Sequence, residues 1–254
     1  MTDKQYRLLL LLNQIDKICR DNGICYSLHG GTLLGSIREK GFISWDNDAD
    51  ISFTRNEYNK FNKIAEKLED YILIDKCIGG PILFYKKNEE EYATIDIFIY
   101  DYISEKKIEK KIKIYLTIIL QAMLKDNRTI RLLNYGNHNV IEKSVYLLFY
   151  HMGKLINKNK KKILLNDIIK NRYCGNRKYI YKSNDTAKYL KEIIPYYYMN
   201  NYIDVNFANK TLMISSYYDK ILSNKYGSDY LIEKYDKQKY EQHEKFIDIV
   251  LKQK

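Results

Sequence analysis

Apolar residues follow a helical rhythm at the start of the chain and a strand-like rhythm after it. Residues 4–22 repeat apolar side chains at roughly helical spacing, which predicts an amphipathic helix that Asn22-Gly23 ends. The next positions predict a strand, a short helix, a strand, a helix opened by a capping box and two strands, over residues 24–29, 32–39, 49–53, 54–70, 82–85 and 92–100. Helices and strands therefore alternate irregularly here, as in a small α/β or α+β unit.

The pattern becomes helical and basic from residue 105 onward. Helices are predicted over residues 105–126, 139–157, 185–197, 216–226 and 237–250. A Lys-rich joint is expected at 158–162 and a short β pair at 202–214. We therefore expect two parts, residues 1–103 and residues 104–254, with a soft boundary near residue 103.

The composition indicates a folded globular protein, and the charge is distributed unevenly along the chain. The 254 residues are 45% hydrophobic and 30% charged, which is ample for a core and excludes disorder and coiled coil. The net charge of +11 is uneven, because residues 1–103 carry −4, residues 104–182 carry +14 and residues 183–254 carry +1. This division predicts that the middle region holds something anionic, while the first part is free to hold a metal.

The cysteines and the apolar runs indicate in which cellular compartment the protein is expected. The four cysteines form no CxxC pair and have no His at zinc spacing, which favours free thiols in a reducing cytosol. The longest later apolar stretch, residues 114–124, has eleven residues and is too short to span a bilayer. We therefore expect a cytoplasmic protein, with peripheral contact at the inner face of the membrane.

The richest chemistry lies between residues 29 and 51. Gly30-Gly31 directly follows a predicted strand, where glycines let the backbone approach a ligand and direct N–H groups at an anion. Asp46, Asp48 and Asp50 alternate, so the carboxylates of Asp48 and Asp50 point to one side of a strand. Crowded carboxylates repel one another unless they are protonated or bridged by a hard cation such as Mg²⁺ or Mn²⁺.

A third carboxylate comes from a later strand. Asp96 lies in the middle of an otherwise apolar run, where an unpaired carboxylate is costly. A cation shared with Asp48 and Asp50 would resolve that cost and provide a two-metal clamp for phosphoryl transfer. Taken alone, Gly30-Gly31 could be an ordinary turn, the aspartates at 46, 48 and 50 could be a solvated or Ca²⁺-binding loop, and Asp96 could be a salt-bridged structural residue. The three features in this order outweigh those interpretations.

Residues 28–53 closely resemble the LicD family of the nucleotidyltransferase (polymerase-β-like) fold, which also contains the fukutin-type proteins. The shared features are a Gly-Gly turn, a following hydrophobic-Arg pair and a Trp-Asp-x-Asp-x-Asp block, here Gly30-Gly31-Thr32-Leu33-Leu34-Gly35, Ile37-Arg38 and Trp45-Asp46-Asn47-Asp48-Ala49-Asp50. Asp96 resembles the third acidic position, and residues 217–230 resemble the closing segment of the family. Asn47 and Ser44 depart from the common Asp and Pro, but both leave the three acidic positions intact.

The resemblance implies both a fold and a reaction. The fold would be α+β, a nucleotidyltransferase core at residues 1–103 with a mixed sheet flanked by helices. Residues 104–254 would add a basic, largely helical region that completes the acceptor side. The reaction would transfer phosphocholine, or a similar phospho-alcohol, from a CDP-activated donor such as CDP-choline to a hydroxyl group, releasing CMP. The acceptor would be a cell-surface glycan or its lipid-linked precursor, as in lipopolysaccharide, teichoic acid or capsule.

The resemblance also assigns roles to individual residues. Asp48, Asp50 and Asp96 would bind Mg²⁺, or Mn²⁺, and carry the catalysis, with Asp96 accepting the proton of the acceptor hydroxyl. Gly30, Gly31 and Thr32 would cradle the nucleotide phosphates. The substrate-binding set is completed by Arg38, which would compensate the diphosphate charge, and Asp46. A surface salt bridge of Arg38 with Glu39 or Asp46 is an equally good interpretation.

Two kinds of alternative function remain: an enzyme of the same fold that uses another activated donor, and a protein that binds RNA. A CDP-ribitol or CDP-glycerol phosphotransferase, or an NTP-dependent nucleotidyltransferase, would keep the fold and change the donor. An RNA-binding protein would account for the charge of +11 and the 26 tyrosines. The basic charge lies away from the acidic motif, however, and no RNP-type aromatic motif is present, so we expect no nucleic acid partner.

Overall fold

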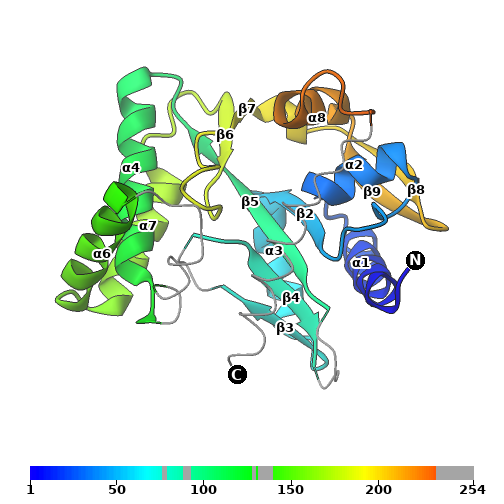
Figure 1. Cartoon of the computed structure of the whole chain (residues 1–254), viewed down its shortest axis with the longest axis horizontal. Coiled ribbons are helices and arrows are strands. Elements are labelled where there is room, and N and C mark those ends of the chain that lie inside the picture. Colours follow the sequence, from blue (N-terminus) through cyan, green and yellow to red (C-terminus); the bar gives the residue numbers. More distant parts are fainter. Residues whose placement is uncertain (76–78, 88–92, 128–129, 131–139, 233–254) are drawn as a thin grey trace.

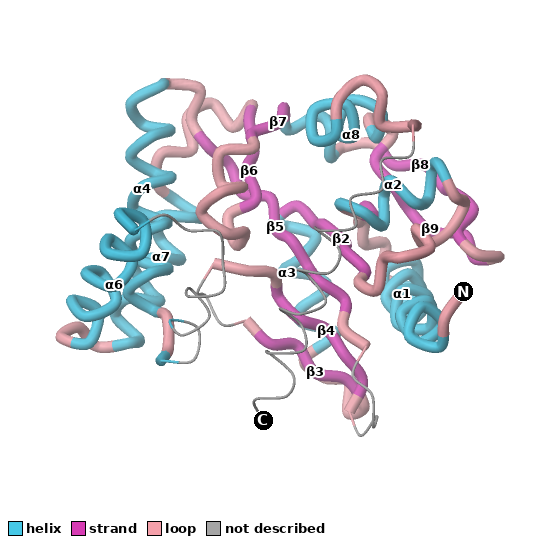
Figure 2. The backbone as a smooth tube through the Cα atoms, in the orientation of Figure 1, coloured by secondary structure: helices cyan, strands magenta, loops and turns pink. Residues whose placement is uncertain are grey.

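The structure, a computed structural model, describes residues 1–75, 79–87, 93–127, 130 and 140–232 (Figure 1). Seven strands of this part form one mixed sheet (Figure 2). Five of them form the main path of the sheet, and β6 and β7 branch from it because β6 pairs with β5 and β7 pairs with β6. The strands are β1 (Ser27–Leu28), β2 (Ala49–Thr54), β3 (Tyr71–Ile74), β4 (Ile82–Lys86), β5 (Ile95–Ile103), β6 (Tyr179–Lys182) and β7 (Ile193–Pro195). The first five follow the order β1-β2-β5-β4-β3, and only the β2–β5 pair among the described strands is parallel.

Helices and a separate hairpin surround the sheet. The helices are α1 (Asp3–Asp21), α2 (Gly30–Arg38), α3 (Arg55–Ala65), α4 (Lys107–Leu124), α6 (Val140–Lys154), α7 (Lys158–Asn171) and α8 (Tyr218–Tyr226). The hairpin pairs β8 (Tyr202–Phe207) with β9 (Lys210–Ser215). Figure 1 shows α1, α2, α8 and the hairpin on one side of β5, and α4, α6 and α7 as a bundle at the opposite end.

The main core is built from both halves of the chain. The alternating apolar side chains of β2 and β5 are buried against α1 and α3. Leu212 and Ile214 of β9 and Leu222 of α8 are fully or almost fully buried in the same core. The sheet likewise continues past residue 103, because β6 pairs with the last four residues of β5. The mixed α+β class expected from the sequence is confirmed.

Several predicted elements are confirmed and two are wrong. The helix at 4–22, the strand at 49–53, the β pair at 202–214 and the helix at 216–226 match α1, β2, β8–β9 and α8. The predicted joint at 158–162 instead begins α7, where the Asn157 side chain accepts hydrogen bonds from the backbone N–H groups of Asn159 and Lys160.

The predicted helix at 185–197 is also wrong. Residues 193–195 pair with β6, and Pro195 has no N–H to continue a helix, so a short 3₁₀ turn follows it. The pattern missed β3 and β6, which are only four residues each. The helix predicted at 237–250 lies outside the described residues.

The helical bundle has its own small core. Leu120, Met123, Leu165, Ile168 and Ile169 are buried between α4 and α7. The buried ammonium of Lys161 donates to the carbonyls of Met123 at 2.8 Å and Gly153 at 2.5 Å, near the ends of α4 and α6. These are carbonyls that a helix end leaves without an intrahelical partner, so Lys161 ties the three helices together. Within the described ranges, no helix is both long and apolar enough to cross a membrane.

Candidate active site

The glycines predicted to form a turn lie in the first turn of α2. Gly30 has φ +55°, and a Cβ there would come 2.3 Å from Asp50 Oδ2. A Cβ on Gly31 would come 2.4 Å from Asp46 Oδ2. Glycine is therefore needed at both positions, because two carboxylates lie directly against the start of the helix. The partial positive charge of that helix end favours such anionic neighbours.

The backbone of Asp50 is held from two sides. Its N–H donates to the Thr32 hydroxyl at 2.8 Å, and its carbonyl accepts from the His29 N–H at 2.9 Å. The loop before β2 is held by α1, because the Gln5 amide donates to the carbonyls of Ile43 and Asp46. These contacts fix the acidic loop relative to α2 before any ligand is present.

The parallel pairing of β2 with β5 brings the distant carboxylate to the motif. Asp50 and Asp96 are direct partners in the register, so their side chains leave the sheet on the same face. Asp48 lies one residue before β2, and Asp46 contacts it through a hydrogen bond. Asp46, Asp48, Asp50 and Asp96 are all half-buried.

These carboxylates disfavour one another's charge. Burial, followed by the charge of Asp48, raises the pKa of Asp46 and of Asp96 to about 8. The same two causes, followed by the charge of Asp96, raise the pKa of Asp50 well above its usual range. Such a cluster is stabilised by protons or by a cation.

A divalent cation fits the chemistry of this cluster. Carboxylate oxygens are the hard ligands that Mg²⁺ and Mn²⁺ prefer. In the part of the chain that the structure describes, no three Asp, Glu, His or Cys side chains already converge tightly enough to hold a metal ion. The cluster supplies the donor atoms and the excess negative charge, and binding would draw the side chains together.

We expect stability without metal to fall as pH rises. Because the folded protein holds the pKa of Asp96 at about 8, against an ordinary value of 3.8, unfolding releases protons between these values. The contribution of Asp96 to stability is therefore complete below about pH 4 and is lost as pH rises toward 8. Thermal unfolding in EDTA should give a lower Tm at pH 8 than at pH 6, and Mg²⁺ should raise Tm more at pH 8.

The variant Asp96→Asn is the control for this pH dependence. It removes one of the three carboxyls whose pKa is raised, so it should reduce both the pH dependence and the Mg²⁺ response. Equal Mg²⁺ responses of the original protein at the two pH values would contradict the shifted carboxylates.

Two lysines from the second half of the chain lie near the start of α2. A Cβ on Gly30 would lie 3.5 Å from Lys225 Nζ, which places this ammonium of α8 beside the start of α2. Desolvation, and then the charge of Lys182, lower the pKa of Lys225, although the residue as a whole is exposed. Within the described ranges Lys225 makes no salt bridge, so its charge is available to an anionic ligand.

Lys182 is held in place by acidic partners. Its ammonium lies 2.7 Å from Asp185 and 3.0 Å from Glu192, and the side chain is almost fully buried. It lies 5.4 Å above the ring of Phe98 on β5. The site therefore combines the four aspartates with the ammonium of Lys225, whereas the charge of Lys182 is balanced by Asp185 and Glu192.

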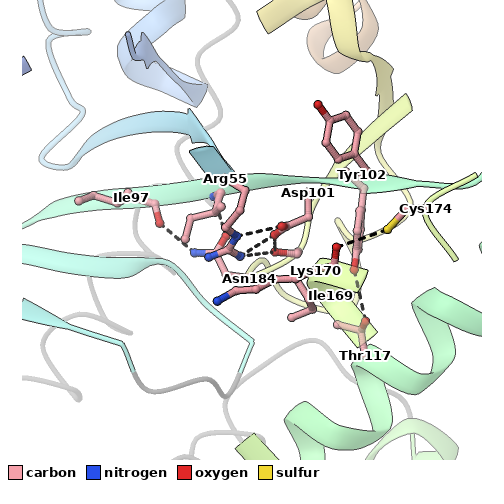
Figure 3. Close-up of polar contacts among 12 residues, drawn as sticks. Arg55, Ile97, Asp101, Tyr102, Thr117, Ile169, Lys170, Cys174 and Asn184 are labelled. Carbon is pink, nitrogen blue, oxygen red and sulfur yellow. Dashed lines mark hydrogen bonds and ion pairs between the residues drawn. The ribbon is translucent and has the colours of Figure 1, made fainter. Parts of the chain in front are cut away.

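Side-chain bonds to β5 position the segment after β6 (Figure 3). The Asn184 amide accepts from the N–H of Ile99 at 2.8 Å and donates to the carbonyl of Ile97 at 2.9 Å, so it continues the pairing where β6 ends. The Arg55 guanidinium donates two hydrogen bonds to the Asp101 carboxylate, at 2.9 and 2.6 Å. The Ser183 hydroxyl donates to the same carboxylate at 2.5 Å. These contacts tie α3, β5 and residues 183–184 together behind the site.

The structure brings together most of the predicted residues. Gly30, Gly31, Thr32, Asp46, Asp48, Asp50 and Asp96 all lie around the first turn of α2. Arg38 lies at the opposite end of that helix and forms a 2.6 Å salt bridge with Glu39, which is the alternative that the sequence left open.

Sequence reasoning missed Lys182 and Lys225. Neither residue has a local pattern that separates it from the 43 Lys and Arg residues of the chain. The one signal was the place of Lys225 within residues 217–230, a segment already noted for its resemblance.

His29 is a further buried group at the site. It is 4% exposed, its ring centroid lies 4.9 Å from that of Phe98, and burial lowers its pKa well below the usual value. Its Nε2 atom has no hydrogen-bond partner in the described part of the chain. A neutral His29 therefore supports the turn by packing and through its backbone.

Comparison with known proteins agrees with this geometry. Residues 23–130 match the family described as LicD/FKTN/FKRP, nucleotidyltransferase domain, a range that includes both glycines and all four aspartates. Over 253 residues the chain is 26% identical to the lipopolysaccharide cholinephosphotransferase LicD of Haemophilus influenzae, covering 91% of each protein. The resemblance to the LicD family and the assignment as a phosphotransferase enzyme are confirmed.

Proposed function

The chain carries a LicD-family domain, and we propose that it transfers phosphocholine from CDP-choline to a hydroxyl of lipopolysaccharide or a related surface glycan. This proposal is supported by the similarity to a lipopolysaccharide cholinephosphotransferase across nine tenths of both chains. We propose a nucleotidyltransferase-type core because residues 23–130 match a family described as a nucleotidyltransferase domain. CMP would be the second product.

The observation that carries the proposal is the meeting of acidic and basic groups at the start of α2. A diphosphate donor with its metal needs carboxylates for the cation and cations for the phosphates. Asp50 and Asp96 face this point from the sheet, and Lys225 faces it from α8. A site for a metal alone would not need the lysine, and a site for an anion alone would not need the carboxylates.

We assign the acidic residues as follows. Asp48, Asp50 and Asp96 would hold Mg²⁺, which when bound neutralises charge on the diphosphate. The acceptor oxygen attacks the phosphorus that carries choline, and the bond from this phosphorus to the oxygen of CMP breaks. The hydroxyl proton would pass to Asp96, which the bound cation keeps ionised and therefore able to accept a proton.

The remaining contacts position the donor. The Thr32 oxygen accepts from Asp50, which leaves its hydroxyl proton free for a phosphate oxygen. Backbone N–H groups of the first turn of α2 and the ammonium of Lys225 would bind the same phosphates. Residues 104–254 would complete the acceptor side, and their basic surface would meet an anionic membrane from the cytoplasmic side.

Thermal unfolding with candidate donors tests the proposal. With Mg²⁺, CDP-choline should stabilise the protein by about 2.7 kcal/mol at a hundredfold excess over Kd, whereas CDP-ribitol, CDP-glycerol, CMP and ATP should do less. The shift should disappear in Asp48→Asn. In Lys225→Gln it should need at least about tenfold more donor, because a charged hydrogen bond to phosphate is lost.

The control is Lys220→Gln, an exposed lysine on the same helix, which should respond like the original protein. A shift with CDP-ribitol or CDP-glycerol alone would replace choline as the transferred group. A shift with ATP alone would make the protein an NTP-dependent nucleotidyltransferase.

A further inference from the structure

The bundle of α4, α6 and α7 has an apolar stripe on its outer surface. Val145, Leu148 and Met152 are spaced three and four residues apart on α6, so they share one face of the helix. They are 46%, 57% and 46% exposed, and Leu155, just after the helix, is 88% exposed. Ile163 on the neighbouring α7 is 69% exposed. Water-exposed apolar residues in such a row indicate an interaction surface.

The stripe is not a displaced part of the bundle core. The opposite sides of these helices are already packed, with Phe149 against the cluster of Leu120, Leu165 and Ile168. Gly153 lets α6 approach α4 so closely that a Cβ there would lie 2.4 Å from the Met123 carbonyl. Because the inner face is closed, turning the stripe inward would require breaking this packing.

Lysines accompany the stripe. The three helices contain eleven lysines and three acidic residues, and two of the lysines, Lys113 and Lys161, are buried on backbone carbonyls. Lys158 and Lys160 are exposed in the first turn of α7, which holds no acidic residue. Lys160 precedes the exposed Ile163 by three residues, so positive charge and an apolar side chain share one face of α7.

We propose that this stripe, with the lysines beside it, docks the protein on an anionic lipid bilayer. Apolar side chains on one face of a helix enter the boundary between headgroups and acyl chains, and flanking lysines bind the anionic headgroups. A second copy of the chain fits the surface poorly, because residues 104–182 carry +14 and two such faces would repel each other. The assignment rests on the proposed membrane contact and is independent of which donor the site uses.

Co-sedimentation with vesicles tests this assignment. The full chain should bind vesicles of phosphatidylcholine mixed with phosphatidylglycerol, and bind much less to phosphatidylcholine alone or at high salt. The double variant Leu148→Glu/Leu155→Glu should lower binding by at least about tenfold. Lys158→Ala/Lys160→Ala should lower it roughly thirtyfold, because each lysine near an anionic surface contributes about 1 kcal/mol.

The control is Leu10→Glu, which changes a leucine that is 49% exposed on α1, at the other end of the molecule (Figure 1). It should bind vesicles like the original protein. All variants should keep the donor-dependent thermal shift, which separates loss of docking from failure of the proposed activity. Unchanged vesicle binding by both double variants would overturn the assignment, as would a stable dimer in solution that only the Leu148→Glu/Leu155→Glu variant dissociates.

Discussion

Asp50→Asn should lower the transfer activity by roughly a thousandfold or more while stabilising the protein without metal. The substitution keeps the shape of the side chain and the two backbone bonds that hold residue 50. It removes the charge that lies against Gly30 and beside its register partner, Asp96. Activity needs that charge to hold the cation, whereas the empty site is destabilised by it, so the two effects have opposite signs.

Steady-state assays and thermal unfolding in EDTA measure the two effects. Asp204→Asn is the control, because Asp204 is 54% exposed and pairs with Arg20 away from the site. It should change activity by less than about twofold and leave Tm in EDTA nearly unchanged. A lower Tm of Asp50→Asn in EDTA would show that the carboxylate has a structural partner and is not destabilised by repulsion from its neighbours.

Asp101→Asn should cost about 3–5 kcal/mol of the free energy of unfolding. The Asp101 side chain is 3% exposed and binds Arg55, which is 18% exposed, so the substitution leaves a guanidinium buried without its counter-charge. Asparagine keeps only one acceptor oxygen, for which Arg55 and Ser183 then compete, so the anchor of the segment that carries Lys182 is weakened. Denaturant unfolding measures the stability, and activity should fall with it.

A comparison of two ion pairs isolates the effect of burial. Asp204→Asn breaks an exposed pair and should cost less than about 1 kcal/mol. The double variant Arg55→Met/Asp101→Leu removes both buried charges and should recover much of the loss. If Asp101→Asn cost no more than Asp204→Asn, the buried pair would not hold α3 to β5.

Much of the candidate site could be predicted from the sequence because its signals are local. The spacing of Asp46, Asp48 and Asp50 and the adjacent Gly30-Gly31 lie within a short stretch, and the strand period places Asp48 and Asp50 on one side. Asp96 was found because a carboxylate in an apolar strand is conspicuous. The opposite sign of charge in the first and middle parts also needed only the sequence.

Short elements and isolated residues could not be predicted in the same way. The strands β3 and β6 are too brief for a period to show, and Ile193-Ile194-Pro195 becomes a strand only because β6 offers an edge to pair with. The Lys-rich segment that begins α7 is helical because Asn157 caps the helix and because the apolar face of α7 packs against α4. A count of its lysines gives no sign of either contact. In each case packing outweighed the local propensity.

The sequence by itself determined the helices and strands with strong periods, the acidic motif and its glycines, because neighbouring residues supply those signals. Only the tertiary structure decided that Lys225 faces that motif, that Asn184 completes the edge of β5, and that α6 leaves its apolar stripe outside. These features depend on which distant segments meet. Such meetings are set by the burial of whole faces of helices and sheets, which no short stretch of sequence records.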